Sequence, residues 1–465
     1  MTRAELGELT VTELVELVVQ LQATNGQLQE RIAELEARLK RPPKTPKNSS
    51  VPPSAGRKAS RGKSSGRSAK GKRGAKAGHK GTSRRRAEPE VVIECCLDRC
   101  PDCESVLSDV EQRLVGSNQV VEIPPVKPVV VEAQRYGCTC PECGAWQVAD
   151  YPPGMEPERV FGRRVETVIT YLHEVHHLSY ARLRVVMQAL FGLLISLGAL
   201  VNVVRRAARR LEPTAEAIRD EIRQSQVVGS DETGARVNGQ NHWQWVFVTD
   251  TATYHVIASS RGSSVIERVM GGAVPLVWVS DLWSAQCKAS KQHHQICHAH
   301  QLRDLQFAID AERSAWAYHF QQLLLRSQRL SKRRGRLPVT LYQRAVAHLE
   351  ADCDVLLAQS VALPEAHKLL RRYHKHRQAL FVFLYHPNVP YDNNGAERAL
   401  RNSVIHRKVS GGFRSQAGAD AHAIVSSVVD TARKRDQDIV DVLQDLIGPP
   451  APTQTIHCLV GGRGE

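Results

Sequence analysis

The sequence contains few aromatic residues, and none of its segments is a convincing membrane span. Phe, Trp and Tyr make up 5% of 465 residues, while the apolar fraction of 42% fits a soluble globular protein of two or three domains. The N-terminus is polar and has no apolar segment typical of a secretory signal. Residues 185–204 carry no charge, but Gly192, Ser196 and Asn202 interrupt them, so we predict the core of a helical domain. We expect no membrane partner.

Acidic residues are absent from one long segment. Residues 41–87 contain sixteen Lys or Arg and no Asp or Glu, whereas the remaining 47 basic residues nearly balance the 48 acidic ones. The net charge of +15 therefore comes from this tract. Its Pro, Gly and Ser content predicts a disordered basic linker over residues 41–90. Its natural partner is a polyanion, and we expect salt-sensitive binding to duplex DNA.

The first forty residues carry a heptad pattern. Apolar residues alternate three and four apart at Val11, Leu14, Val18, Leu21, Leu28, Ile32, Leu35 and Leu39. Asn25 fills the one gap, and a lone Asn at such a position typically selects a parallel dimer. We therefore predict a coiled coil over residues 1–40 and a homodimer or a larger assembly. A single amphipathic helix packed on its own protein is the alternative.

Cysteines are concentrated in one region: seven of the eleven lie between Cys95 and Cys143. The spacing does not fit a secreted disulfide framework and indicates metal binding in a reducing compartment. Two matching Cys-Pro-x-Cys turns supply the predicted ligands of a structural Zn²⁺ in a zinc ribbon over residues 91–150, namely Cys100, Cys103, Cys140 and Cys143. The surplus thiols of Cys95, Cys96 and Cys138 are alternative ligands. Four thiolates leave no open position, which argues against a catalytic zinc.

The segment 155–215 has a helical pattern. We predict helices over 165–173, 180–190 and 197–211, with the second ending near Gly192 and the third capped by Ser196. A short Gly-containing turn followed by a basic helix suggests a helix-turn-helix unit, with Arg205, Arg206 and Arg209 as DNA contacts. An ordinary helical bundle explains the same pattern.

The periodicity changes at residue 226. Three strands, a short helix and a buried strand over 274–280 follow in order, with Asn238-Gly239 as a hairpin turn. This is the opening order of an RNase H-like fold, in which an acidic residue on the first strand neighbours one at the end of the fourth. Asp231 and Asp281 occupy those places. A third carboxylate must come from a later helix, where Glu397 is well placed behind a capping Asp392 or Asn393.

Carboxylates at these positions suit phosphodiester chemistry. Two Mg²⁺ ions held by hard oxygen ligands activate the attacking oxygen and stabilise the leaving one. We predict Asp231 as the bridging ligand, with Asp281 and Glu397 completing one site each, and accept Mn²⁺ as an alternative ion. Nearby phosphate contacts are predicted at Arg398, Arg401, Arg407 and Lys408.

Several motifs together resemble the transposases of the insertion sequence 66 family. The resemblance runs from the heptads to about residue 445 and is carried by Lys47-Asn48-Ser49-Ser50, the cysteine turns, Asp231-Glu232-Thr233-Gly234, Cys297-His298-Ala299-His300 with Arg303, Asn393-Asn394 with Glu397-Arg398, and Arg407-Lys408. The second acidic motif, Ser280-Asp281-Leu282-Trp283, departs from the Asp-Gly-Tyr that is usual in the family.

The resemblance implies a DDE triad at Asp231, Asp281 and Glu397, Mg²⁺ dependence and recognition of terminal inverted repeats. It implies a catalytic core over 224–415, a helical insertion over about 305–385, and a C-terminal helical segment and tail over 416–465. Cys297, His300 and Arg303 are interpreted as structural support for the site. Small accessory transposition proteins become possible partners, and the expected location is the nucleoid in the bacterial cytoplasm.

The sequence thus predicts a multidomain α+β DNA transposase with a coiled coil, a zinc ribbon, a helix-turn-helix-like domain and an RNase H-like core. Two alternatives stay open. One is a zinc-containing DNA-binding protein that has lost cleavage, and the other is a nuclease on the same fold.

Overall fold

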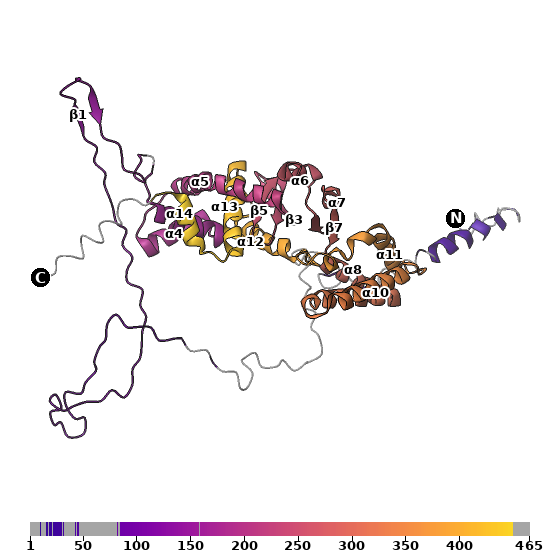
Figure 1. Cartoon of the computed structure of the whole chain (residues 1–465), viewed down its shortest axis with the longest axis horizontal. Helices are drawn as coiled ribbons and strands as arrows, with labels where there is room; N and C mark the ends of the chain where they lie inside the picture. The colour runs from indigo at the N-terminus through magenta and orange to yellow at the C-terminus, as the bar shows by residue number, and fades with distance from the viewer. Residues whose placement is uncertain are drawn as a thin grey trace.

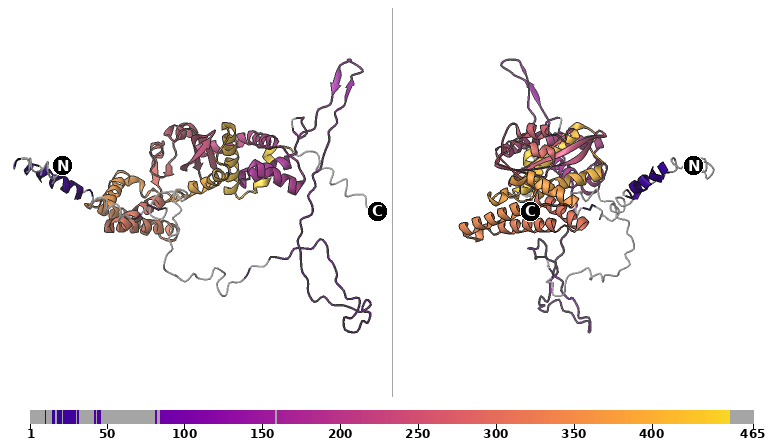
Figure 2. Two further views of the ribbon diagram at one scale, coloured as in Figure 1. Left: turned by 180° about the vertical axis from the view of Figure 1, so that it is seen from behind. Right: turned by 90° about the vertical axis from the view of Figure 1, so that its right-hand side faces the viewer.

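The structure is a computed structural model of the whole chain that describes residues 84–157 and 159–449. Before residue 84 it describes only residues 10, 15–16, 18–20, 22–29, 31, 42, 44–45 and 81. Most of the predicted basic linker and the tail after residue 449 lie outside these residues. The described residues between 15 and 31 are helical and their apolar side chains are exposed, Val15 and Leu28 at 57% each. Both views of Figure 2 show this helix outside the main body. The coiled-coil dimer stays a prediction.

A five-stranded mixed sheet forms the centre of the molecule. Its strands are β3 (Val227–Val237), β4 (Gln240–Val248), β5 (Thr253–Ala258), β6 (Val277–Ser280) and β7 (His293–Ile296), in the spatial order β5-β4-β3-β6-β7. The first three form an antiparallel meander, whereas β6 and β7 run parallel to β3. The predicted order of three strands, a helix and a buried strand is confirmed.

The β3–β4 hairpin turns at the predicted Asn238-Gly239 pair. Both residues have positive φ, +48° and +74°, as a tight hairpin turn requires, and Asn and Gly tolerate this conformation best. The N–H of Asn238 also donates to the carbonyl of Phe413, which ties the turn to the chain that leaves α12 (Asn394–Ser410).

The two faces of the sheet bury different helices because side chains alternate along each strand. Trp245 and Phe247 of β4 pack in one core with α5 (Leu197–Gln224), α6 (Ser263–Met270), α13 (Gln416–Lys434) and α14 (Ile439–Ile447). Val246 and Val248, the alternate residues, pack on the other face against Ala396 and Leu400 of α12. The helix that carries Glu397 therefore lies directly against the sheet.

Helix α13 covers the edge strand β5. The hydroxyls of Thr431 and Ser427 accept hydrogen bonds from the backbone N–H groups of Thr253 and His255, at 3.0 and 2.9 Å. Without these bonds the two N–H groups would be unpaired at an open edge of the sheet. The core therefore extends past residue 415, and the predicted C-terminal helical segment is an integral layer of it.

A second group of helices follows β7. It comprises α8 (His298–Glu312), α9 (Ala315–Ser331), α10 (Val339–Leu357) and α11 (Pro364–Lys375), and Figure 1 shows α8, α10 and α11 gathered at one end of the body. Their core contains the stacked rings of Phe320 and Tyr373, whose centroids lie 4.3 Å apart. The helices predicted for the insertion are present.

Shorter helices lie at the opposite end of the body, where α3 (Arg163–Thr170) continues as a π-helix, η1 (Tyr171–Val175), and is followed by α4 (Tyr180–Phe191). Gly192 ends α4 at φ +65°, and the Ser196 hydroxyl caps α5, both as predicted. The predicted end of α5 at residue 211 is wrong, because the helix continues through Pro213 to Gln224. Leu211, Ala215 and Ile218 are buried, and this packing outweighs the cost of the proline. The first turns of α5 pack against α3 and α4 through Leu200 and Val203, and the rest of the helix packs in the core on the sheet.

The cysteine-rich segment lies apart from the main body. A short hairpin of β1 (Gly137–Thr139) and β2 (Trp146–Val148) stands at the tip of a long arm (Figure 1). An isolated bridge joins Arg99 to Val106 around the first cysteine turn. Throughout the described residues, each helix is too short or too polar to cross a bilayer.

Candidate active site

The register of the parallel ladder brings Asp231 and Asp281 together. Gly229 of β3 pairs with Val279 of β6, and each aspartate follows two residues later. Neighbouring strands lie about 4.8 Å apart, so the two carboxyl groups meet at one end of the sheet. Asp281 is the first residue after β6, as predicted, and its Oδ1 accepts the backbone N–H of Trp283 at 2.9 Å.

Asn393 fixes the start of α12 to the same end of the sheet. Its side-chain amide donates to the carbonyl of Ser230 at 2.8 Å, and its backbone N–H donates to the sulfur of Cys297 at 3.2 Å. Asn393 occupies the predicted N-cap position, but its side chain makes this long-range bond and does not cap the helix. Glu397 therefore enters the site in the first turn of α12.

The three predicted carboxylates converge. Burial raises the pKa of Asp231 well above its usual value, and the neighbouring charges of Glu232, Asp281 and Glu397 raise it further. A neighbouring negative charge raises a carboxyl pKa only at short range. Residues from β3, from the end of β6 and from α12 thus share one electrostatic site.

Glu232 lies next to this site on the other face of the sheet, and its role was not predicted from the sequence. It points to the opposite face of β3 from Asp231, where Arg261 lies 3.0 Å from Oε1 and the amide of Gln286 donates to Oε2 at 2.9 Å. Burial raises the pKa of Glu232, and the nearby charge of Asp281 also raises it. The adjacent acidic pair in Asp231-Glu232 was the available signal.

Cys297, His300 and Arg303 lie beside Glu397, as expected for supporting residues. His300 Nδ1 and an Arg303 guanidinium nitrogen approach Glu397 Oε1 at 3.6 and 3.7 Å. Within the described part of the chain, both Glu397 Oε1 and His300 Nδ1 are buried without a hydrogen-bond partner. Burial lowers the pKa of His300 and raises that of Cys297 to about 12, so the thiol stays neutral.

Helix α12 also displays basic side chains. Arg398, Arg401 and Lys408 are exposed, and their spacing of three and seven residues places them along one side of the helix. Arg407 is different, because its guanidinium donates to the carbonyl of Gly234 on β3. Three of the four predicted phosphate contacts are therefore exposed, and the fourth binds the protein itself.

The basic run of α5 divides in the same way. Arg206 forms a 2.5 Å ion pair with the fully buried Glu166 of α3, which also pairs with Arg159 at 3.2 Å. Arg205 and Arg209 are exposed, and Arg205 lies 3.4 Å from the hydroxyl of Ser415. Arg206 thus holds α3 against α5, a role that differs from the predicted DNA contact.

Each cysteine turn forms separately. In both turns the N–H four residues after the first cysteine, that of Glu104 or Gly144, donates to the carbonyl of Cys100 or Cys140 at 2.9 Å. Hydrogen bonds from Ser105 lower the pKa of Cys103, and backbone N–H groups of Cys143 and Glu142 lower that of Cys140.

The structure does not bring the two turns into one ligand set. Among the described residues, two groups offer three donor atoms within 4.8 Å of one another, and neither includes a cysteine of the turns. One is Cys297, His300 and Glu397, and the other is Glu174, His406 and His422. The zinc ribbon stays a prediction.

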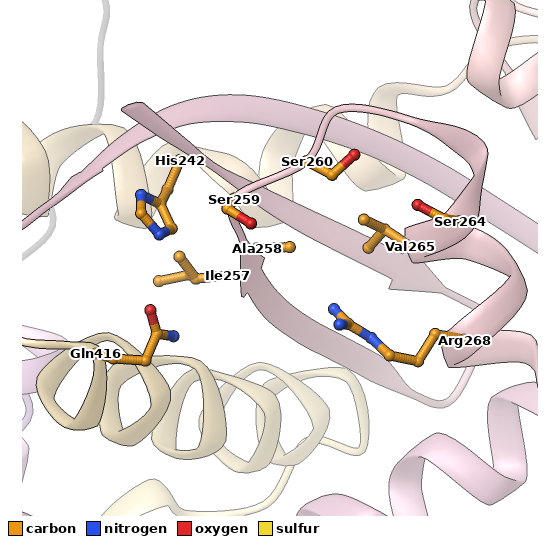
Figure 3. A pocket seen from close by; sticks show the side chains of 9 residues that line it. All are labelled: His242, Ile257, Ala258, Ser259, Ser260, Ser264, Val265, Arg268 and Gln416. Atoms are coloured by element: carbon orange, nitrogen blue, oxygen red, sulfur yellow. The ribbon is translucent and has the colours of Figure 1, made fainter. Parts of the chain in front are cut away.

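A cavity of about 460 Å³ lies beside β5, α6 and the start of α13 (Figure 3). His242, Ser260, Arg268 and Gln416 are among the residues that line it, and none of the predicted site residues does. The candidate chemistry therefore belongs to the carboxylates at the end of the sheet.

Comparison with known proteins gives two family matches. Residues 159–421 match the family described as "Transposase IS66 family", and residues 2–85 match a family of unknown function. The uncharacterized protein y4hP of Sinorhizobium fredii is 24% identical over 425 residues, which cover 78% of this chain and 72% of the relative. The first match covers more than half of the chain and contains all three converging carboxylates. The chain therefore belongs to the IS66 family of transposases.

Proposed function

We propose that this transposase is of the DDE type, with Asp231, Asp281 and Glu397 as the metal-binding catalytic residues. Family membership gives the chain a role in transposition with DNA as its partner. The proposed reaction is cleavage at the terminal inverted repeats of an insertion sequence and transfer of the cut strand to target DNA. The proposal rests on one arrangement: the β3–β6 register sets Asp281 beside Asp231, and Glu397 lies in the first turn of the helix that packs on the same face of the sheet.

The sheet supports this proposal. Its order β5-β4-β3-β6-β7, with an antiparallel meander followed by two parallel strands, is the arrangement expected of an RNase H-like core. In such a core the first strand lies beside the fourth, so their acidic residues meet. A later helix on one face of the sheet then supplies the third carboxylate, as α12 does.

The residues present fit Mg²⁺ or Mn²⁺. The donors are carboxylate oxygens, which these ions prefer. Burial and the neighbouring negative charges raise the pKa of Asp231, and a bound divalent cation would offset both effects. Glu397 Oε1 is buried without a hydrogen-bond partner in the described structure, which suits a ligand atom. When bound, two such ions activate the attacking oxygen and stabilise the leaving one.

The other residues of the site would bind DNA phosphates or hold Glu397 in position. Arg398, Arg401 and Lys408 are free to contact phosphates beside the carboxylates. Asn393 locks the start of α12 to β3 through Ser230, and this bond sets where Glu397 lies. Burial keeps His300 neutral, so it supports Glu397 without neutralising its charge.

Two further proposals concern the N-terminal part. The lowered pKa values of Cys103 and Cys140 favour thiolates, which supports a structural Zn²⁺ held by the four cysteines once the turns meet. The exposed apolar side chains of the N-terminal helix, among them Val18 and Leu28, support a coiled-coil dimer. A dimer carries two copies of the site, one for each end of an element.

The test is a strand-transfer assay with the purified full chain, Mg²⁺ and a labelled element end. We expect nicking at the end and joining to target DNA, both lost with a chelator. Glu397→Gln should abolish both steps while DNA binding persists. Asp250→Asn is the matched control, because Asp250 is exposed and lies two residues after the end of β4.

Each other outcome assigns another function. Binding without nicking in the wild type would support a DNA-binding protein that has lost cleavage. Nicking without joining would support a nuclease. Full activity of Glu397→Gln would remove Glu397 from the triad.

A further inference from the structure

A second cluster of metal-type donors lies buried away from the carboxylate site. It joins Glu174 of η1, His406 of α12 and His422 of α13, which are 7%, 5% and 1% exposed. Each offers one ligand atom, and these three atoms lie within 4.8 Å of one another. His422 Nδ1 is 2.6 Å from Glu174 Oε2, and the rings of His406 and His422 have centroids 4.4 Å apart.

Two imidazole nitrogens of this region are not satisfied within the described chain. Nδ1 of His406 and Nδ1 of His177 are both buried and have no hydrogen-bond partner. The centroids of these two rings lie 5.8 Å apart, edge to face, and the ring of His173 lies edge to face with that of His406 at 5.9 Å. A buried polar atom without a partner costs free energy, so its presence beside a carboxylate and a second imidazole points to a ligand.

We propose that Glu174, His406 and His422 form a structural site for a zinc-type divalent ion that clamps η1, α12 and α13 together. Two imidazoles and one carboxylate are donors that Zn²⁺ accepts, whereas Mg²⁺ prefers oxygen ligands alone. The site is separate from the carboxylates and does not rest on the proposed catalytic role.

The residues His173-Glu174-Val175-His176-His177 match the His-Glu-x-x-His pattern of zinc peptidases, but their backbone does not have the geometry of that motif. That motif needs two histidines on one face of an α-helix, with the glutamate as the general base. Here residues 171–175 form a π-helix, and His177 has φ +58°. The cluster takes its two imidazoles from α12 and α13, and its burial leaves no room for a substrate, so the site is structural.

The clamp has a mechanical consequence. Helix α12 carries Glu397 in its first turn and His406 about two and a half turns later. An ion at His406 would therefore fix the helix that presents the third carboxylate. Through Glu174, the same ion would attach η1, which continues α3, to α12 and to α13.

The test counts zinc in the full chain. In a background of Cys100→Ser, Cys103→Ser, Cys140→Ser and Cys143→Ser, the purified protein should retain about one zinc by elemental analysis. His406→Ala and His422→Ala should each remove it and abolish the fall in melting temperature that a chelator causes. His367→Ala is the matched control, because His367 is exposed on α11 and should leave the zinc in place.

A crystal of the wild-type chain makes the test independent of how these variants fold. An anomalous peak at the zinc edge between Glu174, His406 and His422 is expected. The absence of a peak at this position would overturn the proposal, and the cluster would then be a metal-free ion pair of His422 and Glu174. Unchanged zinc in folded His406→Ala would overturn it as well.

Discussion

Helix α12 takes part in two sites that differ in donors and in burial. The carboxylate site lies at the end of the sheet, where Asp231, Asp281 and Glu397 are half-buried and offer only oxygen. The histidine cluster lies further along the helix, where His406 meets Glu174 and His422 in a closed interior. An open oxygen site is suited to changing partners during a reaction. A closed imidazole site is suited to holding one ion and the helices around it.

The largest effects are expected at the carboxylate site, and Asp281 is the member to test against a nearby aspartate. Asp281→Asn removes one charge from the carboxylate site, and we expect strand transfer to fall by about 10³-fold or more while DNA binding persists. The measurement is single-turnover strand transfer with Mg²⁺. Asp304→Asn is the control, because Asp304 lies on α8 and forms an ion pair with Arg372 of α11 at 2.6 Å. If Asp304→Asn lost strand transfer and Asp281→Asn kept it, Asp304 would replace Asp281 as the second carboxylate of the triad.

A smaller effect is expected where α12 is attached to the sheet. Asn393→Ala leaves the buried carbonyl of Ser230 unpaired and should lower the free energy of unfolding by about 2–3 kcal/mol. Strand transfer should also fall, because Glu397 loses its fixed position. Asn394→Ala serves as the control, since within the described residues its side-chain amide bonds locally, to the neighbouring Asp392. Urea unfolding and strand transfer measure both effects, and equal losses in the two variants would remove this role from Asn393.

His255 of β5 and Asp430 of α13 form another buried histidine–carboxylate pair, with 2.9 Å between His255 Nε2 and Asp430 Oδ2. Among the described residues this pair has no second imidazole beside it, unlike the histidine cluster, so we expect it to act as an ion pair and bind no metal. Although burial raises the pKa of Asp430, its bonds to His255 and Arg433 lower it overall. A lowered carboxyl pKa stabilises the fold above the unfolded value and loses this effect as pH falls through the folded one.

Asp430→Asn should therefore cost about 1–2 kcal/mol of unfolding free energy at pH 7, and the difference from wild type should shrink toward pH 3. Unfolding curves at the two pH values measure it, and a chelator should not change the difference. A difference that is constant with pH would mean that the charge of Asp430 contributes nothing.

The smallest effect concerns the exposed basic side of α12. Replacing Arg398, Arg401 and Lys408 with Ala should weaken DNA binding at every sequence. The slope of log affinity against log salt should become shallower by about 0.9 for every phosphate group that the protein no longer binds. Lys368→Ala, on α11, is the control and should leave the slope unchanged. A triple variant with the wild-type slope would place the DNA elsewhere.

The sequence predicted those features that depend on local pattern. Asp281 followed from an apolar run that ends at a charged residue, and the parallel register of β3 and β6 placed it beside Asp231. The Asn238-Gly239 turn and the end of α4 at Gly192 followed from residues that tolerate those conformations.

Features that depend on distant partners were not predictable in this way. Arg206 belongs to a basic run, but its partner Glu166 is 40 residues away and buried. The packing of α13 on β5 depends on hydroxyls of Ser427 and Thr431 that give no pattern of their own. The histidine cluster draws on three segments between residues 174 and 422, and only folding brings them together.

The most direct test of the catalytic account is strand transfer by Asp231→Asn. Asp231 is the residue whose pKa both other carboxylates raise, so it lies at the centre of the proposed site. With Mg²⁺ and a labelled element end, we predict that the wild-type chain nicks and joins DNA, and that folded Asp231→Asn binds the same DNA without cutting it. Cutting and joining by Asp231→Asn at the wild-type rate would contradict the account.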